Sequence, residues 1–379
     1  MSSTSERWFG AGHSTAADSA KAGGEAAAAA IAGRRAAAVF AFTSGGHDPA
    51  AVLAAVRAEA GDAVVVGGTG FGELSPAGAT RHGVAVAALG GDGFTARVRT
   101  ADIGELGARE AGAEAARAVA EIDAPYTALL LICDGTALGP HEIVRGAYSV
   151  VGAAVPMVGG LTADPVQLCG DRVLANSVIG VALGSPRPVG IGMAHGWRRI
   201  EPPMIVTRSE GERLCELDGE PAFDALVRRR GTDGTAERLF TDSGFLQPIG
   251  LARRSGLDIR SLKVGPDGDT AVYGTSEIPQ GSLVWAMDAK QADIVAGAGA
   301  AIDEAVAALG GHEPLGVLAF DCGGRKIALG ADGIGDEVAA MRAALGDVPF
   351  AGFYTLGEIA RVRGAAGMHQ LTLVALALA

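Results

Sequence analysis

Cysteine is scarce in this chain: only four of the 379 residues are cysteine, and no two form a C-x-x-C pair. The seven histidines show no H-x-x-x-H spacing either. Structural zinc sites and disulfide frameworks need such residues in close groups. We therefore expect no structural metal, and free thiols that suit a reducing compartment.

Basic charge is also scarce. The 31 Lys and Arg residues face 43 Asp and Glu residues, which gives a formal net charge of −12, and only four of the basic residues are lysines. Such a surface repels phosphate backbones and anionic lipids, so neither nucleic acid nor a membrane is an expected partner. A cationic ligand or a basic partner surface would be attracted, although negative charge also simply keeps a protein soluble.

Long apolar runs and nucleotide-binding motifs are missing. The longest apolar tail, residues 371–379, is far shorter than the ~20 residues that span a bilayer. Met1–Arg7 is polar with both charge signs, and no secretory signal follows it. The sequence holds no G-x-x-x-x-G-K-[ST], and Gly67–Glu73 lacks the helix that follows a dinucleotide fingerprint. We expect a cytoplasmic protein without a cofactor.

One order of elements occurs three times along the chain. Each copy has an apolar strand, a segment with helical spacing, a second short strand, a Gly-rich stretch and an apolar closing strand. The opening strands are expected at 36–42, 129–133 and 315–320, the helices at 48–60, 141–151 and 336–345, and the closing strands at 84–89, 178–183 and 373–378.

Continuous apolar strands of this kind are covered on both faces. The repeat therefore predicts an α/β fold with mixed sheets and helices packed outside them. Pro and Gly interrupt residues 187–218, so we place a boundary there, between modules at 30–205 and 206–379. Residues 231–281 are expected to be rich in loops and to hold short strands and turns, and an Ala-rich helix is expected at 290–309.

Five stretches, taken together and in order, resemble the FIST family from about residue 30 onward. They are Gly67–Glu73 (GGTGFGE), Gly159–Asp164 (GGLTAD), Phe320–Arg325 (FDCGGR), Gly352–Ile359 (GFYTLGEI), and His195–Trp197 with Val206-Thr207 and Leu217–Gly219. The resemblance implies paired N-terminal and C-terminal FIST modules.

The resemblance also implies a sensory role in signal transduction. Members of the family are proposed to bind small ligands, with amino acids as candidates, and to pass the signal to attached domains or separate partners. Since 379 residues leave no room for a kinase, a cyclase or an F-box, we expect a separate signalling protein to read the signal. Some related sensors are haem proteins that detect nitric oxide, which makes a haem-based gas sensor an alternative.

Two of the stretches share the pattern G-x-x-x-x-G-E. Ligands often bind at loops after strand ends, where glycine lets the backbone approach them. A carboxylate could hold an ammonium group there, and exposed N–H groups could hold a carboxylate, which together suit an amino acid or a similar small amine or carboxylate. The alternative is a tight bend whose Glu caps a backbone N–H. The predicted ligand-binding residues are Thr69, Gly72, Glu73, Tyr354, Gly357 and Glu358.

Cys322 follows a buried strand, and Arg325 lies three residues later. A nearby guanidinium can lower the pKa of a thiol, but a nucleophile also needs a base, and no His is close in sequence. Three interpretations stay open: a catalytic thiol, a thiol and guanidinium that face the ligand, and a buried structural cysteine. We expect a binding protein and keep a Cys-dependent enzyme as an alternative.

Three further polar residues are candidates. His195 is the best choice for an axial ligand if haem binds, and otherwise it is an ordinary hydrogen-bonded histidine. Asp134 and Asp164 follow the first strand and the Gly-rich stretch of the second copy. They either line the ligand site or form Asx-turns.

Overall fold

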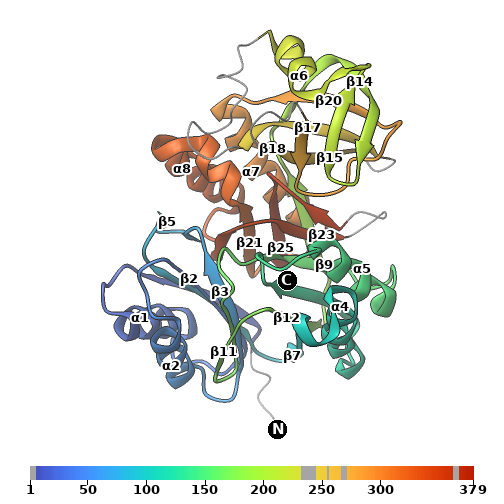
Figure 1. Cartoon of the computed structure of the whole chain (residues 1–379). Helices are drawn as coiled ribbons and strands as arrows, with labels where there is room; N and C mark the ends of the chain where they lie inside the picture. Colours follow the sequence, from blue (N-terminus) through green and yellow to red (C-terminus); the bar gives the residue numbers. More distant parts are fainter. Residues whose placement is uncertain (1–5, 232–244, 254–255, 266–270, 362–366) are drawn as a thin grey trace.

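The computed structural model describes residues 6–231, 245–253, 256–265, 271–361 and 367–379. It contains three α/β units, each with a six-stranded sheet, and a seven-stranded β-barrel that projects from the third unit (Figure 1). The predicted fold class is confirmed, because every copy of the repeat folds as a mixed sheet with helices outside.

The first unit follows the repeat but begins earlier than expected, with an additional strand and helix. Its elements are β1 (Trp8–Ser14), α1 (Ser19–Ile31), β2 (Ala36–Ser44), α2 (Pro49–Ala60), β3 (Val64–Gly70), the hairpin β4 (Glu73–Ser75) and β5 (Gly78–Thr80), and β6 (Val84–Gly90). The strands β2 and β3 are parallel, and β6 is antiparallel to β2. Asp48 caps α2 with Pro49 in its first turn, as a helix start allows.

The second unit repeats this order. Its elements are β7 (Thr95–Asp102), α3 (Ile103–Leu106), α4 (Ala108–Ala116), the 3₁₀ helix η1 (Arg117–Glu121), β8 (Tyr126–Cys133), α5 (Pro140–Val151), β9 (Met157–Leu161), the hairpin β10 (Gln167–Cys169) and β11 (Arg172–Leu174), and β12 (Ser177–Ser185). The strands β8 and β9 are again parallel, with β12 antiparallel to β8.

The third unit is split by the barrel. Its elements are β13 (Val189–Ala194), α7 (Gln291–Ala307), β21 (Gly316–Cys322), α8 (Gly323–Leu345), β22 (Phe350–Thr355), the hairpin β23 (Glu358–Arg361) and β24 (Met368–His369), and β25 (Leu373–Leu378). The helix α8 begins thirteen residues before the expected 336. Gly330, which has non-helical backbone angles, kinks it, and the expected helix lies within the part after the kink.

The barrel lies between β13 and α7 in the sequence. Its elements are β14 (Arg198–Glu210), β15 (Arg213–Leu217), β16 (Glu220–Pro221), α6 (Ala222–Arg230), β17 (Phe245–Arg253), β18 (Gly256–Val264), β19 (Val272–Gly274) and β20 (Leu283–Asp288). The strand β14 stands at one end of the strand order and also pairs with β15, which is next to the other end, and this pairing closes the barrel. The short strands expected within 231–281 are present as β17, β18 and β19, two of which are nine residues long. The expected module boundary at 205/206 falls within β14.

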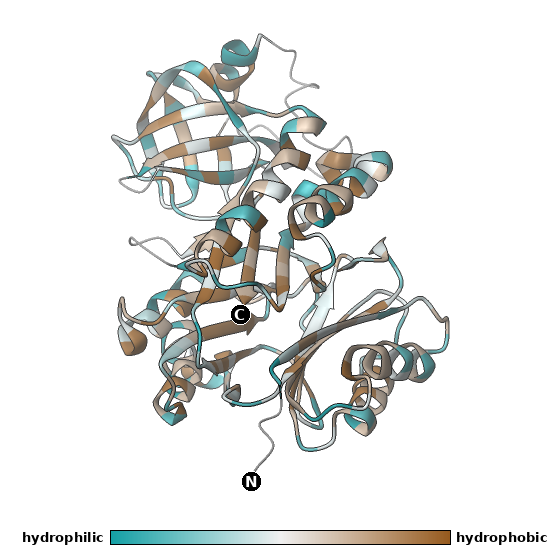
Figure 2. Cartoon of the chain, turned by 180° about the vertical axis from the view of Figure 1, so that it is seen from behind, coloured by the Kyte–Doolittle hydropathy of each residue, from teal (hydrophilic) through white to brown (hydrophobic). Residues whose placement is uncertain are grey.

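The three sheets enclose a common apolar core, and the helix pairs α1–α2, α4–α5 and α7–α8 cover their outer faces. Figure 2 shows hydrophobic residues, in brown, along the strands in the middle of the molecule. Phe42 stacks on Phe353 with ring centroids 4.5 Å apart, and Phe320 meets Phe42 edge-on at 6.4 Å. Aromatic contacts therefore link the first unit to the third.

Each hairpin joins the sheet of a different unit. The hairpin of the first unit extends the third sheet through β4 and β22, that of the second unit extends the first sheet through β10 and β3, and that of the third unit extends the second sheet through β23 and β9. The expected Gly-rich loops are therefore largely strand ends from which the chain crosses to another unit. Among the described residues, no helix has the length and apolar character needed to cross a bilayer.

The glycines at these strand ends have a packing role, which Gly352→Ala tests. A Cβ at Gly352 would overlap the carbonyl oxygen of Ala319 on the neighbouring strand. We expect the substitution to lower the free energy of unfolding by about 1–3 kcal/mol, as overpacking does. Gly24→Ala is the control: it lies within α1 with no atom within 4 Å of the added Cβ. Gly24→Ala should raise the free energy of unfolding by about 0.5–1 kcal/mol. Urea denaturation of both variants and of the wild type measures the two effects. Equal effects of the two substitutions would contradict this account of Gly352.

Candidate functional site

Polar side chains gather at the carboxyl ends of the parallel strands β21 and β22 in the third unit. Asp321 and Cys322 end β21, and Tyr354 and Thr355 end β22. The helix α8 begins directly after β21, so its first turn returns Arg325 to the strand end. The kink at Gly330 separates this turn from the longer part of the helix, which contributes Glu337.

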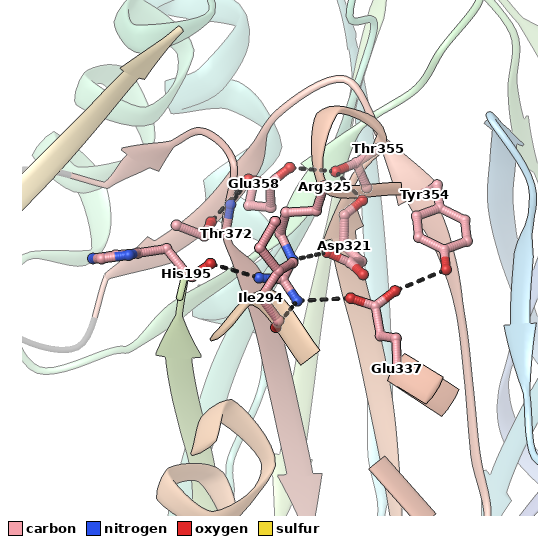
Figure 3. A network of polar contacts seen from close by, with 9 residues as sticks. All are labelled: His195, Ile294, Asp321, Arg325, Glu337, Tyr354, Thr355, Glu358 and Thr372. Atoms are coloured by element: carbon pink, nitrogen blue, oxygen red, sulfur yellow. Dashed lines mark hydrogen bonds and ion pairs between the residues drawn. The ribbon is translucent and has the colours of Figure 1, made fainter. Parts of the chain in front are cut away.

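Arg325 is at the centre of the cluster and is completely buried (Figure 3). Its Nε donates to Asp321 Oδ1 at 2.7 Å, and Nη2 donates to Glu337 Oε1 at 2.7 Å. Nη1 donates to the carbonyl of His195 at 2.7 Å, and Nη2 also reaches the carbonyl of Ile294 at 3.1 Å. A guanidinium can be buried only when partners of this kind replace water.

The network continues to Tyr354, whose hydroxyl donates to Glu337 Oε2 at 2.9 Å. Burial, and then the Glu337 carboxylate, hold the pKa of Tyr354 well above its usual value, so its phenol stays a donor. Asp321, Arg325, Glu337 and Tyr354 therefore form one buried chain of hydrogen bonds.

Glu358 lies beside this chain and is also completely buried. Thr355 donates its hydroxyl to Oε1 at 2.7 Å, and Thr372 donates its hydroxyl at 2.8 Å and its N–H at 3.2 Å to Oε2. Burial raises the pKa of Glu358 from 4.5 to about 7, against the opposing effect of these hydrogen bonds. Its carboxyl group therefore titrates near neutral pH.

The cluster has more carboxyl groups than cations. Asp321, Glu337 and Glu358 are all fully buried, and Arg325 pairs with only the first two. Asp321 Oδ2 accepts no hydrogen bond from an N–H or hydroxyl group of any described residue, although the Asp321 carboxyl group also interacts with the carboxyl group of Glu337. Burial and the neighbouring Glu337 raise the pKa of Asp321 well above 3.8, although Arg325 opposes the shift. The strand ends can thus accept an additional proton or cation.

Glu73 occupies the equivalent position in the first unit. It lies opposite Phe353 in β22, as Glu358 lies opposite Gly160 in β9 and Gln167 lies opposite Gly68 in β3. Thus the shared G-x-x-x-x-G-E pattern marks one position of the repeat, which holds Gln in the second unit.

Glu73 and Glu358 bond within their own units. Glu73 Oε2 accepts from Thr80 at 2.5 Å, and burial raises the pKa of Glu73, opposed by nearby hydroxyls and by Lys326. Lys326 in α8 donates to the carbonyls of Phe71 at 2.6 Å and Thr80 at 3.3 Å, and burial lowers its pKa to about 8. Among the interactions of the described residues, none joins the two glutamates, so the geometry gives no support to one shared pocket.

The remaining predicted residues lie elsewhere. Thr69 lies at the seam between the first and second units, where its carbonyl accepts from Ala163 at 2.9 Å. Gly72 packs against Lys326 with a φ of +138°, a conformation that favours glycine. Gly357 is buried where the third hairpin begins, and its carbonyl accepts from Leu161 at 2.9 Å.

The two aspartates of the second unit do not join the cluster. Both Asp134 oxygens are used: Oδ1 accepts from the N–H and hydroxyl of Thr136, and Oδ2 accepts from the Asn176 N–H at 2.8 Å. The contact with Thr136, two residues later, is that of an Asx-turn, which was the second of the two interpretations of Asp134. Asp164 is exposed, and its carbonyl accepts from the Thr162 hydroxyl at 2.6 Å.

Cys322 and His195 do not contact each other through their side chains in any described interaction. The Cys322 thiol is hydrogen-bonded to Glu358, and burial raises the thiol pKa well above 9.0. His195 Nδ1 accepts from the Trp197 N–H at 2.8 Å, and burial followed by Arg325 lowers the pKa of His195 to about 4. Within the described ranges, no group of three His, Cys, Asp or Glu side chains is arranged to hold a metal.

Sequence reasoning missed Asp321, Lys326, Glu337 and Thr372. Asp321 lies within the F-D-C-G-G-R stretch and Lys326 directly follows it, so both could have been included for their charge. Glu337 and Thr372 carry no local signal, because only packing brings them to the strand ends.

The pH dependence of stability tests the burial of Glu358. Between pH 4.5 and 7 the folded chain keeps a proton on Glu358 that the unfolded chain has lost, so stability falls as the pH rises through this window. Glu358→Gln should remove up to about 3 kcal/mol of this fall, measured by urea denaturation at pH 5 and pH 8. Glu59→Gln, on exposed α2 surface, controls for the lost charge. An unchanged pH dependence in Glu358→Gln would refute this role for Glu358.

Alkylation tests Cys322. Because a buried thiol with a raised pKa is a poor nucleophile, iodoacetamide at neutral pH should modify native Cys322 no faster than Cys133, and denaturant should expose both. Mass spectrometry of the digested protein gives the rates. Rapid modification of native Cys322 alone would favour a catalytic thiol.

The sequence matches two family models and is similar to proteins of mycobacteria. The sequence matches the FIST N domain over residues 37–220 and the FIST C domain over 222–361. It is 31% identical over 237 residues to an uncharacterised protein of Mycobacterium tuberculosis, covering 59% of each chain. It is 29% identical over 238 residues to an uncharacterised protein of Mycobacterium bovis, covering 59% of this chain and 58% of that one. The chain thus spans less than two thirds of the length of these relatives.

Among solved structures, the alignment with T. maritima PurL complexed with ADP covers 98% of this chain and 71% of the PurL chain. The sequence identity is 12% and the TM-score is 0.24, a similarity too low to carry an argument.

Proposed function

The chain belongs to the FIST family, which is associated with sensory signal transduction, and from this premise we propose that it senses a small amine, such as an amino acid, at the strand ends of its third unit. The observation that carries the proposal is the unpaired, fully buried Asp321 Oδ2 beside Glu358. An ammonium group would supply the donor and the positive charge that these carboxyl groups lack.

The chemistry of burial supports an amine. A buried acceptor without a donor costs about 1–3 kcal/mol, and more when it is charged. A bound ammonium group offsets this cost with charge-assisted hydrogen bonds, which are about twice as strong as neutral ones. Proteins with sheets of this type also bind ligands beyond the carboxyl ends of their parallel strands, which is where Asp321 lies.

A comparison among the units supports a specific role for the acid at position 358. Gln167 occupies the equivalent position in the second unit and is fully buried. Its amide donates to the Thr162 hydroxyl, whereas Glu358 accepts from the Thr355 hydroxyl. The fold therefore tolerates a neutral amide at the same place. It does not require an ionisable group at position 358, and the carboxyl group of Glu358 fits a role in binding.

A thermal-shift screen of the twenty amino acids and of simple alkylamines tests the proposal. We expect at least one amine to raise the melting temperature of the wild type. Its affinity, measured by calorimetry, should fall at least tenfold in Glu358→Gln and in Asp321→Asn, because each removes a buried charge partner. The deaminated analogue of the ligand, which keeps any carboxylate, should not bind.

Glu73→Gln is the matched control, because Glu73 occupies the same position of the repeat but bonds within the first unit. It should leave the affinity unchanged. The proposal fails if no amine stabilises the wild type, or if an amine that does so binds Glu358→Gln and Asp321→Asn equally well.

A further inference from the structure

Two chain segments connect the inserted barrel to the three units. The first, His195–Trp197, leads from β13 into β14, and the second, Ala289-Lys290, leads from β20 into α7. The first segment lies against the start of α7, directly after the second: Gly196 packs against Asp293 and Ile294, and Arg198 forms an ion pair with Asp293. Whatever holds these segments fixes the barrel relative to the rest of the molecule.

Arg325 holds the entering segment against the first turn of α7, which directly follows the second segment. It donates to the carbonyl of His195 in the entering segment and to the carbonyl of Ile294 in the first turn of α7 (Figure 3). Its other bonds go to Asp321 and Glu337, which also belong to the third unit. A single guanidinium thus joins the strand-end cluster to the entering segment and to the turn that follows the second segment.

An apolar contact lies beside this junction. Trp197, Ile259 and Met287, from the entering segment and the barrel, pack with Cys322 and Leu371 of the third unit. A second polar contact lies at the barrel wall, where the N–H of Ser261 donates to the side-chain carbonyl of Gln370 at 2.9 Å. Apolar packing of this kind is not directional, so it holds the surfaces together without fixing one orientation. The guanidinium, with its donors in a planar fork, supplies direction.

We propose that Arg325 is a latch that sets the orientation of the barrel according to the charge state of the strand-end carboxyl groups. When Asp321 is ionised and unoccupied, it holds the Arg325 fork toward both carbonyls. When a proton or a ligand cation neutralises Asp321, the fork loses its strongest partner and the barrel connections are released. The barrel is then the part of the chain that reports the state of the site. This coupling to a ligand rests on the proposed function, whereas the latch itself does not.

The groups that face Arg325 come from four elements and from the entering segment. They are the Asp321 carboxyl group of β21, the Glu337 carboxyl group of α8, the Tyr354 hydroxyl of β22 bonded to it, the Ile294 carbonyl of α7, and the carbonyl and imidazole of His195. Glu358 of β23 and Lys326 of α8 are the neighbouring charges that act on Asp321. The Asp321 carboxyl group accepts from the guanidinium and from no other described N–H or hydroxyl group, so a change in its charge acts on the latch first.

Distances between spin labels test the latch without any ligand. One label at Gln280→Cys in an exposed barrel loop and one at Glu59→Cys in α2 report the barrel position, since the four native cysteines are buried. The wild type should give one narrow distance distribution. Arg325→Lys, which keeps the charge but loses the fork, should broaden it, and Asp321→Asn, which mimics the neutralised site, should broaden or shift it in the same way.

Arg230→Lys is the matched control, because Arg230 also donates to several backbone carbonyls, those of Gln247, Pro248 and Met287, but all within the barrel. It should leave the distance distribution narrow. Amide hydrogen exchange gives a second readout: in Arg325→Lys, exchange at residues 195–198 and 291–298 should rise at least tenfold, while exchange in β2 and β8 stays slow. Tyr354→Phe removes only the hydroxyl that donates to Glu337. It should broaden the distance distribution and raise exchange in the same regions, but less than Arg325→Lys does. It replaces Arg325→Lys in the test if that variant does not fold.

A narrow, wild-type distance distribution in Arg325→Lys, or in Tyr354→Phe if that variant must be used, would overturn the latch. So would a rise in exchange that is equal in β2, β8 and the connections, since that is general destabilisation. A wild-type distribution in Asp321→Asn alone would overturn the coupling to the site. Because no ligand enters these measurements, their failure is separate from a failure to find a binding amine.

Discussion

Every sheet of the three units is completed by a hairpin from another unit. Without the exchanged hairpin, β3, β9 and β22 would each be an exposed edge with unpaired backbone groups, which invites pairing with other chains. The exchange runs from the first unit to the third, from the third to the second and from the second to the first, so it closes into a ring. No unit has a complete sheet alone, and the rest of the architecture follows from this mutual dependence.

The exchange also decides where polar chemistry can occur. The chain must cross between units at each strand end, and there the polar residues Glu73, Gln167 and Glu358 become buried at equivalent positions. Neighbouring hydroxyls satisfy part of their bonding in every unit. Among the residues that the structure describes in the three units, only those of the third add a buried guanidinium and two further carboxyl groups at the strand ends. The barrel is inserted in this same unit. The excess of buried acid and the inserted domain meet at Arg325.

The internal repeat made much of the fold predictable, because each copy has to bury the same strands. The runs 36–42, 129–133 and 315–320 are long, apolar and bounded by turns, and they fold as β2, β8 and β21. The preceding helices α1, α4 and α7 were harder to assign to the repeat, since their Ala-rich sequences differ in length and the third is separated from its strand by the barrel. The barrel strands were expected to be shorter than they are and had no predicted bounds within 231–281, because β17 and β18 contain Pro, Gly and charged residues that resemble loops.

The sequence by itself determined which residue types are available at the strand ends: Cys322 and Arg325 after one apolar strand, and Tyr354 and Glu358 after the next, all in the third copy. Local chemistry is enough for this, because a buried strand followed by glycine and polar residues predicts a turn at a sheet edge. Only the tertiary structure decided that Glu73 and Glu358 bond within their own units instead of in one shared pocket, that Glu337 reaches Arg325, and that Arg325 reaches the entering barrel segment and the first turn of α7. These contacts join residues up to 130 positions apart through hairpin exchange and domain insertion. No pattern of neighbouring residues encodes such pairings, because they arise when complete sheets pack around one core.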